Sequence, residues 1–150
     1  IWLGRKSAFG AIGQISDYMC LDGTIPVSEL PYVLKRIGEI GDEYGLKVGN
    51  VFHAGDGNMH PLILFDANKP GDLELCEQMG AEILRLCVEV GGCLTGEHGV
   101  GVEKRDLMFD QYSHQDIEAQ LNIKDVFDPK WLLNGAKVFP LISTENRRAA

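Results

Sequence analysis

The sequence predicts an α+β fold of the ferredoxin-like (split βαβ) type, an antiparallel sheet with helices on one face, plus C-terminal helices. Two observations lead to this prediction. Apolar residues recur at helical spacing over residues 28–45 and 72–90, and short strand-like segments precede and follow both ranges. The resulting order is β-α-β-β-α-β, and the last of the additional helices is expected to begin at Ser113.

The first half of this order starts with a lead-in over residues 1–13 and a strand over residues 15–23, which Asp22-Gly23 closes. Ser28 is the expected N-cap of the first helix, because a serine hydroxyl can accept a hydrogen bond from an amide of the first helical turn. Gly45 suits the end of that helix, where a left-handed conformation is common.

The second half contains two strand-like segments, residues 48–53 and 60–65, which are rich in apolar side chains. Asp56-Gly57 between them is a strong signal for a two-residue hairpin turn. Asp72 is the expected cap of the second helix. Residues 93–95 are expected to form a short fourth strand.

Composition and charge narrow the range of functions. The chain has 150 residues, 45% of them hydrophobic, which is sufficient for one domain with a buried core. Its net charge of −8 argues against nucleic acid and against an anionic membrane surface. No apolar run approaches the roughly 20 residues of a membrane span, and we expect no signal peptide. We therefore expect a cytoplasmic protein, and the four cysteines are expected to be reduced thiols.

The predicted hairpin would bring two histidines together. If Asp56 and Gly57 form the turn, His53 lies directly opposite His60, with Cβ atoms about 5 Å apart. Two imidazoles at this separation can bind one divalent ion. The alternative is that each histidine packs or makes a hydrogen bond by itself.

A second glycine-rich segment, residues 95–101, carries Glu97 and His98. Glu97 is a natural third ligand for an ion at the hairpin. His98 would remain available as a general base, since neutral imidazole accepts a proton near neutral pH.

At His53-Ala-Gly-Asp-Gly-Asn-Met-His60 and Gly96-Glu-His-Gly-Val-Gly101 the sequence resembles the C-terminal domain of the FAD-linked oxidases, flavoenzymes that are similar to vanillyl-alcohol oxidase. The resemblance covers nearly the whole chain and is strongest to glycolate oxidase FAD-binding subunits, with D-lactate and D-2-hydroxyglutarate dehydrogenases as relatives. It implies that residues 1–150 are the substrate- and metal-binding domain of a longer polypeptide. A separate N-terminal domain would hold the FAD, so we expect the 150-residue chain alone to be inactive.

The resemblance also implies roles at particular positions. His53, His60 and Glu97 would be the ligands of a divalent zinc, manganese or iron ion, and His98 would be the base. Arg5 would bind the substrate carboxylate. Gly57 and Asn58 would be cofactor-binding residues that contact the flavin. From composition alone, Arg5 and its neighbour Lys6 are a solvated basic pair.

The implied activity is oxidation of a 2-hydroxy acid to the 2-oxo acid with hydride transfer to FAD. Three departures from the hydroxyglutarate enzymes concern the substrate: Phe9, Cys20 and Leu62 stand where those enzymes have threonine, lysine and asparagine. Those polar groups handle a second carboxylate. Their replacement favours a small monocarboxylate such as glycolate or D-lactate.

Partners and alternatives follow from the same resemblance. Glycolate oxidase-like subunits work with other subunits, including an iron–sulfur subunit, and such partners could place the protein peripherally at the inner membrane. Two other function classes stay open at the sequence level. The chain could be a self-contained metallohydrolase, which would turn over without a flavin domain, or a ferredoxin-like structural module without chemistry.

Overall fold

The computed structural model describes residues 2–141, apart from the side chain of Arg5. The chain divides into two compact units, Ile1–Gly96 and Glu97–Ala150. Among the described residues, every strand lies in the first unit. The predicted α+β class is confirmed, because helices combine with antiparallel sheets.

The main sheet has three antiparallel strands in the order β1-β5-β3. They are β1 (Asp17–Cys20), β5 (Pro61–Phe65) and β3 (Val48–Asn50). A smaller sheet pairs β2 (Gly23–Thr24) with β4 (Asn58–Met59). The expected fourth strand at residues 93–95 is reduced to one antiparallel bridge between Cys93 and Thr24.

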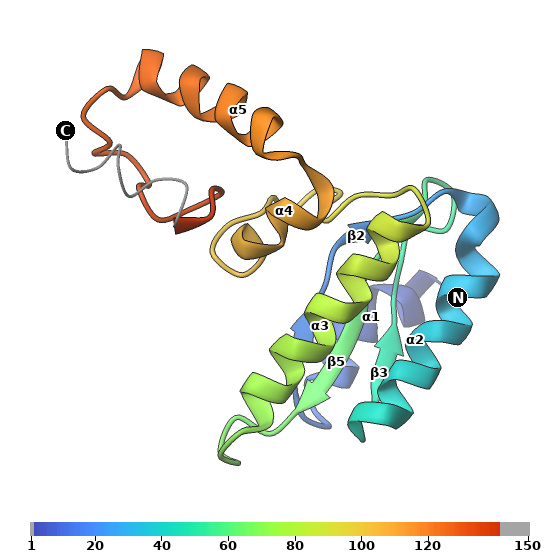
Figure 1. The fold of residues 1–150 in the computed structure, drawn as a ribbon. Coiled ribbons are helices and arrows are strands. Elements are labelled where there is room, and N and C mark those ends of the chain that lie inside the picture. The colour runs from blue at the N-terminus through green and yellow to red at the C-terminus, as the bar shows by residue number, and fades with distance from the viewer. Residues whose placement is uncertain (1, 142–150) are drawn as a thin grey trace. The chain divides into compact units, whose positions relative to one another are not determined.

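Helices α2 (Leu30–Tyr44) and α3 (Asp72–Glu89) pack together on one face of the main sheet (Figure 1). Their apolar stripes have the predicted helical spacing, and their inward side chains are fully or almost fully buried. These side chains are Val33, Ile37, Ile40, Cys76, Met79, Ile83 and Cys87. The core of the first unit therefore lies between this helix pair and the sheet.

The prediction of helices on one face only was wrong. The expected lead-in forms α1 (Trp2–Ile12), which packs on the opposite face of the sheet. Tyr18 of β1 contacts Phe9 of α1, whereas a Cβ added to Gly80 of α3 would lie 3.5 Å from the sulfur of the next strand residue, Met19. Because neighbouring strand residues point to opposite faces, α1 and α3 cover different sides of β1.

Two predicted helix caps were also wrong. A short 3₁₀ turn, Val27–Glu29, precedes α2, and Ser28 lies inside that turn rather than at the cap. Gly71 is the N-cap of α3, and the Asp72 carboxylate instead accepts hydrogen bonds from the Asp66 amide and the Lys69 ammonium. In both cases a neighbouring turn displaces the helix start.

The regular elements described in the second unit are all helical. It contains η2 (Arg105–Leu107), α4 (Met108–Gln111) and α5 (His114–Phe127). Ser113 begins α5 as predicted, with a reciprocal capping box to Asp116. A small cluster forms the core of this unit, made of Met108, Ile117, Leu121 and Trp131. Within residues 2–141, no helix is long and apolar enough to cross a membrane.

Candidate functional site

The hairpin between β3 and β5 places two histidines on one face of the sheet. The register differs from the prediction, because His53 is bridged to Asn58 rather than to His60. A shift of two positions keeps the same face, since side chains alternate with a period of two. His60 is thus a diagonal neighbour of His53, and the two ring centroids lie 5.4 Å apart in an edge-to-face arrangement.

The turn has four residues, 54–57, instead of the expected two. The His53 carbonyl accepts hydrogen bonds from the amides of both Asp56 and Gly57, which closes the longer loop. Gly57 has φ +78°, and a Cβ at this position would lie 2.0 Å from the Ile25 carbonyl oxygen. The Gly57 carbonyl also accepts from the Ile25 amide at 3.0 Å. A tertiary contact therefore sets the turn length.

A buried carboxylate lies beside the hairpin. The Asp22 side chain is fully buried, and its Oδ1 lies 3.5 Å from Nε2 of the buried His60. Its Oδ2 accepts hydrogen bonds from the Thr95 hydroxyl at 2.5 Å and from the Gly96 amide at 3.0 Å. One carboxylate thus contacts both the hairpin and the segment that leads into Glu97.

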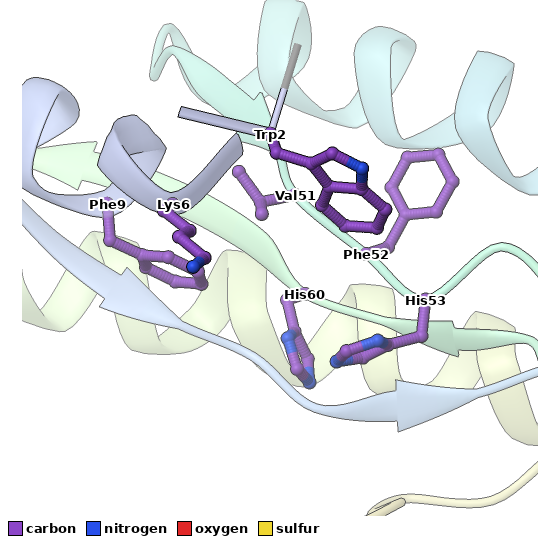
Figure 2. A pocket seen from close by; sticks show the side chains of 7 residues that line it. All are labelled: Trp2, Lys6, Phe9, Val51, Phe52, His53 and His60. Carbon is purple, nitrogen blue, oxygen red and sulfur yellow. The ribbon is translucent and has the colours of Figure 1, made fainter. Parts of the chain in front are cut away.

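A pocket of ≈ 270 Å³ opens between α1 and the hairpin. Figure 2 shows Lys6 and Phe9 approaching it from α1, with the rings of His53 and His60 side by side at the other end. The remaining lining residues are Trp2, Val51 and Phe52. The wall is thus mostly apolar or aromatic, with one ammonium group and two imidazoles, as in many small-molecule sites.

Three further predicted site residues, Arg5, Glu97 and His98, lie outside the hairpin. The backbone of Arg5 lies in α1 between Trp2 and Lys6, and its side chain is outside the described part of the structure. Glu97 and His98 are the first two residues of the second unit. Their distance from Asp22 is limited by the chain itself, because Gly96 is hydrogen-bonded to Asp22 and precedes Glu97 directly.

Gly57 and Asn58, the expected flavin contacts, have structural partners in the first unit. Gly57 is required by the contact with Ile25. Asn58 is buried, and a Cβ added to Gly96 would lie 2.8 Å from the atoms of its side-chain amide. Asn58 therefore packs closely against the segment that precedes Glu97.

The chemistry of this donor set suits a divalent ion. Imidazole nitrogens and carboxylate oxygens bind zinc, manganese and iron. In the first unit the donors are His53 and His60, and the Asp22 carboxylate lies beside His60. No sulfur belongs to this donor set, so the set does not distinguish among these three metals.

Sequence reasoning missed Asp22 and Lys6. The pattern Asp22-Gly23 indicates a turn, but an aspartate that directly follows the strand-like residues 15–21 is also typical of a site at a strand end. Lys6 is exposed, which agrees with the predicted solvated pair, but it also lines the pocket. Trp2, Lys6 and Phe9 have the i, i+4, i+7 spacing of one helix face. That signal required recognising residues 2–12 as a helix.

Comparison with known proteins gives the same family as the hairpin and loop motifs indicate. Residues 1–138 match the family described as FAD linked oxidases, C-terminal domain. The chain belongs to this family. The predicted resemblance is therefore confirmed at the level of the family.

Individual relatives cover most of the chain. It is 54% identical over 142 residues to glycolate oxidase subunit GlcD of Escherichia coli K12, covering 94% of the chain and 28% of that protein. It is 37% identical to the GlcD subunit of Bacillus subtilis, covering 90% of the chain and 29% of the relative. Mitochondrial cytochrome D-lactate dehydrogenase of Kluyveromyces lactis is 30% identical, covering 80% of the chain and 20% of the relative. The chain spans less than a third of the length of these relatives.

Proposed function

We propose that this chain is the substrate- and metal-binding part of a flavin-dependent 2-hydroxyacid dehydrogenase or oxidase. The observation that carries the proposal is the pairing of His53 and His60 at the end of the pocket beneath α1, with the buried Asp22 carboxylate 3.5 Å from Nε2 of His60. Membership of the FAD linked oxidase family and similarity to glycolate oxidase and D-lactate dehydrogenase proteins support this chemistry. The relatives' names favour glycolate or D-lactate as substrate.

The proposed metal ligands are His53, His60 and Glu97, with Asp22 close by. Histidine and acidic side chains can supply the ligands of a metal ion, and the described residues of these types that could do so are Asp22, His60, Glu97 and His98. When bound, a divalent ion would lower the pKa of the substrate 2-hydroxyl, and FAD would accept the hydride from C2.

Residues of this chain would bind the substrate and accept its proton. His98, the proposed base, takes the proton of the 2-hydroxyl. Arg5, the proposed carboxylate ligand, makes a charge-assisted pair that fixes the orientation of the substrate. Lys6 lies in the pocket wall and adds positive charge for an anionic substrate. Gly57 and Asn58, at the hairpin turn, are the proposed contacts to the flavin.

The pocket supports a small monocarboxylate. Phe9 forms part of its wall. The resemblance implies that the hydroxyglutarate enzymes have a threonine hydroxyl there for a second carboxylate. Leu62 is fully buried and offers no polar atom. A second carboxylate placed against the Phe9 ring would meet apolar atoms, which carries a desolvation cost.

Further parts of the proposal concern the whole protein. Residues 1–150 would work as one domain of a longer polypeptide whose N-terminal part holds FAD, together with other oxidase subunits, including an iron–sulfur subunit. A cytoplasmic location, or a peripheral one at the inner membrane through those subunits, accompanies this assignment. Cell fractionation of the tagged full-length protein tests the location.

We also propose that the first unit is a reduced ferredoxin-like fold. The order β1-β5-β3 agrees with three of the four expected strands, and the bridge between Thr24 and Cys93 puts the fourth segment beside the extension of β1. Slow hydrogen exchange at the Cys93 amide, which donates to the Thr24 carbonyl, would support this relationship.

The decisive experiment measures metal and flavin reduction in the full-length polypeptide. Elemental mass spectrometry should find near-stoichiometric zinc, manganese or iron in the wild type and loss of this metal in the His53→Ala/His60→Ala variant. His114→Ala is the matched control, because His114 lies in α5 outside both motifs. Glycolate or D-lactate should reduce the flavin of the wild type and of the control variant, and of neither the double variant nor His98→Ala.

Three outcomes would refute parts of the proposal. Equal metal content in the wild type and the double variant would remove the hairpin from the metal site. Turnover of a hydrolytic substrate by the 150-residue chain, without flavin, would favour the metallohydrolase. Reduction by D-2-hydroxyglutarate at a rate equal to that with glycolate would contradict the assignment of a monocarboxylate.

A further inference from the structure

We propose that Asp22 is a positioning residue that holds His60 and the loop before Glu97 in one arrangement. This inference rests on the proposed metal site and adds a residue to it. Asp22 is not one of the proposed ligands, and the family resemblance assigns it no role. Its place is the end of the first strand region, where the chain passes from β1 to β2.

The two carboxylate oxygens of Asp22 face different segments. Oδ2 accepts hydrogen bonds from the Thr95 hydroxyl and the Gly96 amide, and the main-chain carbonyl of Asp22 accepts a further bond from the same amide at 2.8 Å. Oδ1 lies 3.5 Å from Nε2 of His60. Asp22 therefore links two segments that are more than thirty residues apart in the sequence.

Burial makes this link rigid. The Asp22 side chain is 0% exposed and that of His60 is 7% exposed. A buried carboxylate is costly to leave without partners, so its donors are held in place. Hydrogen bonds to a charged acceptor are also stronger than those between neutral groups.

Each contact fixes a different proposed ligand. Adjacent Cα atoms are about 3.8 Å apart, so anchoring Gly96 limits where the backbone of Glu97 can lie. The 3.5 Å contact to His60 exceeds the ordinary hydrogen-bond range, so it acts through charge and orients the imidazole. Carboxylates that orient metal-binding histidines in this way are common, and replacing them weakens metal affinity by about 10- to 100-fold.

The test measures Zn²⁺ affinity of the full-length polypeptide by competition with a chromophoric chelator. Asp22→Asn should weaken binding by about 10- to 100-fold, since the amide retains the shape and loses the charge. Thr95→Val should weaken binding by a smaller factor, and Thr95→Ser, which retains the hydroxyl, should restore it. The double variant Asp22→Asn/Thr95→Val should bind like Asp22→Asn alone, because both changes break one link.

Asp72→Asn is the matched control. Asp72 is also a buried carboxylate of the first unit, but its partners are the Asp66 amide and Lys69. This change should lower the melting temperature and leave Zn²⁺ affinity unchanged. A weakening equal to that of Asp22→Asn would show that general destabilisation, not positioning, governs the metal affinity.

The outcomes separate this inference from the proposed function. If His60→Ala abolishes Zn²⁺ binding while Asp22→Asn binds like the wild type, the metal site stands and the role of Asp22 is refuted. If the wild type binds no Zn²⁺, the proposed metal site fails. Hydrogen-exchange mass spectrometry of the metal-free protein then decides the role of Asp22. Faster exchange over residues 93–98 in Asp22→Asn supports positioning, and unchanged exchange refutes it.

Discussion

On one face of the main sheet, α2 and α3 bury Ile37, Met79 and Ile83 completely, whereas on the other face α1 leaves Trp2 73% exposed. The pocket with its two histidines opens on the second face. The closely packed face supplies most of the apolar burial, and the looser face leaves room for a ligand. The comparison indicates that the first unit separates stability from binding by using opposite sides of the same three strands.

Core truncation should give the largest difference between the faces. Ile83→Ala should lower the free energy of unfolding by about 2–5 kcal/mol, because it removes a fully buried side chain and leaves a cavity. Phe9→Ala, on the half-buried α1 face, should cost less than about 2 kcal/mol, since less apolar area is lost. Urea denaturation measures both values, with the exposed Leu73→Ala as control. Equal costs for Ile83→Ala and Phe9→Ala would contradict the comparison.

The hairpin turn offers a matched glycine pair. Gly57→Ala should cost more than about 2 kcal/mol, because the left-handed conformation and the 2.0 Å approach to the Ile25 carbonyl both oppose a Cβ. Gly55→Ala should change the free energy of unfolding by less than about 0.5 kcal/mol, because a Cβ there meets no atom within 4 Å. Thermal unfolding would show whether the two differ. Similar losses would mean that the Ile25 contact does not set the turn.

The alkylation rates of two cysteines should differ between the two faces of the sheet. Burial raises the pKa of the Cys76 thiol, which lies on the α3 side of the sheet, to about 11. At pH 8 only about one in a thousand of these thiols is a thiolate, so Cys76 should react far more slowly than the half-buried Cys20. Peptide mass mapping after timed iodoacetamide treatment measures both rates. Faster modification of Cys76 than of Cys20 would overturn this expectation.

The same thiol predicts a pH dependence of stability. The pKa of Cys76 is higher in the folded state than the ordinary value of 9.0, so its contribution is fully present below pH 9. Above pH 9 the unfolded thiol loses its proton first, and stability should fall as pH rises towards about 11. Cys76→Ala should reduce this slope. The urea midpoint as a function of pH measures it.

The smallest effect on stability is expected at the pocket rim. Trp2→Ala should change the free energy of unfolding by less than about 0.5 kcal/mol, because Trp2 is largely exposed. If the proposed function holds, the same change should raise the KM of the full-length polypeptide for the proposed 2-hydroxy acid severalfold, since Trp2 lines the pocket. Leu3→Ala is the control, as Leu3 is 80% exposed and does not line the pocket. Equal KM values for both variants would show that the substrate does not bind in this pocket.

Local patterns predicted the parts of the fold that depend on neighbouring residues. Helical spacing predicted α2 and α3 and their buried stripes, and Ser113 with Asp116 predicted the start of α5. The two histidine motifs predicted the family. Even with the wrong register, the even shift left His53 and His60 on the same face, because strand side chains alternate.

Other features depend on contacts between distant parts of the chain. Residues 2–12 have little amphipathic contrast, and their helix is placed by contacts of Phe9 and Ile12 with the sheet. The turn length depends on Ile25, thirty-two residues before Gly57.

By itself, the sequence determined helices α2 and α3, the start of α5 and the family, because spacing and residue type are local properties. Only the tertiary structure decided which carboxylate approaches His60 and which helix encloses the pocket. Asp22 is brought to Thr95 and Gly96 by the pairing of strands, and no short-range pattern encodes such a long-range contact.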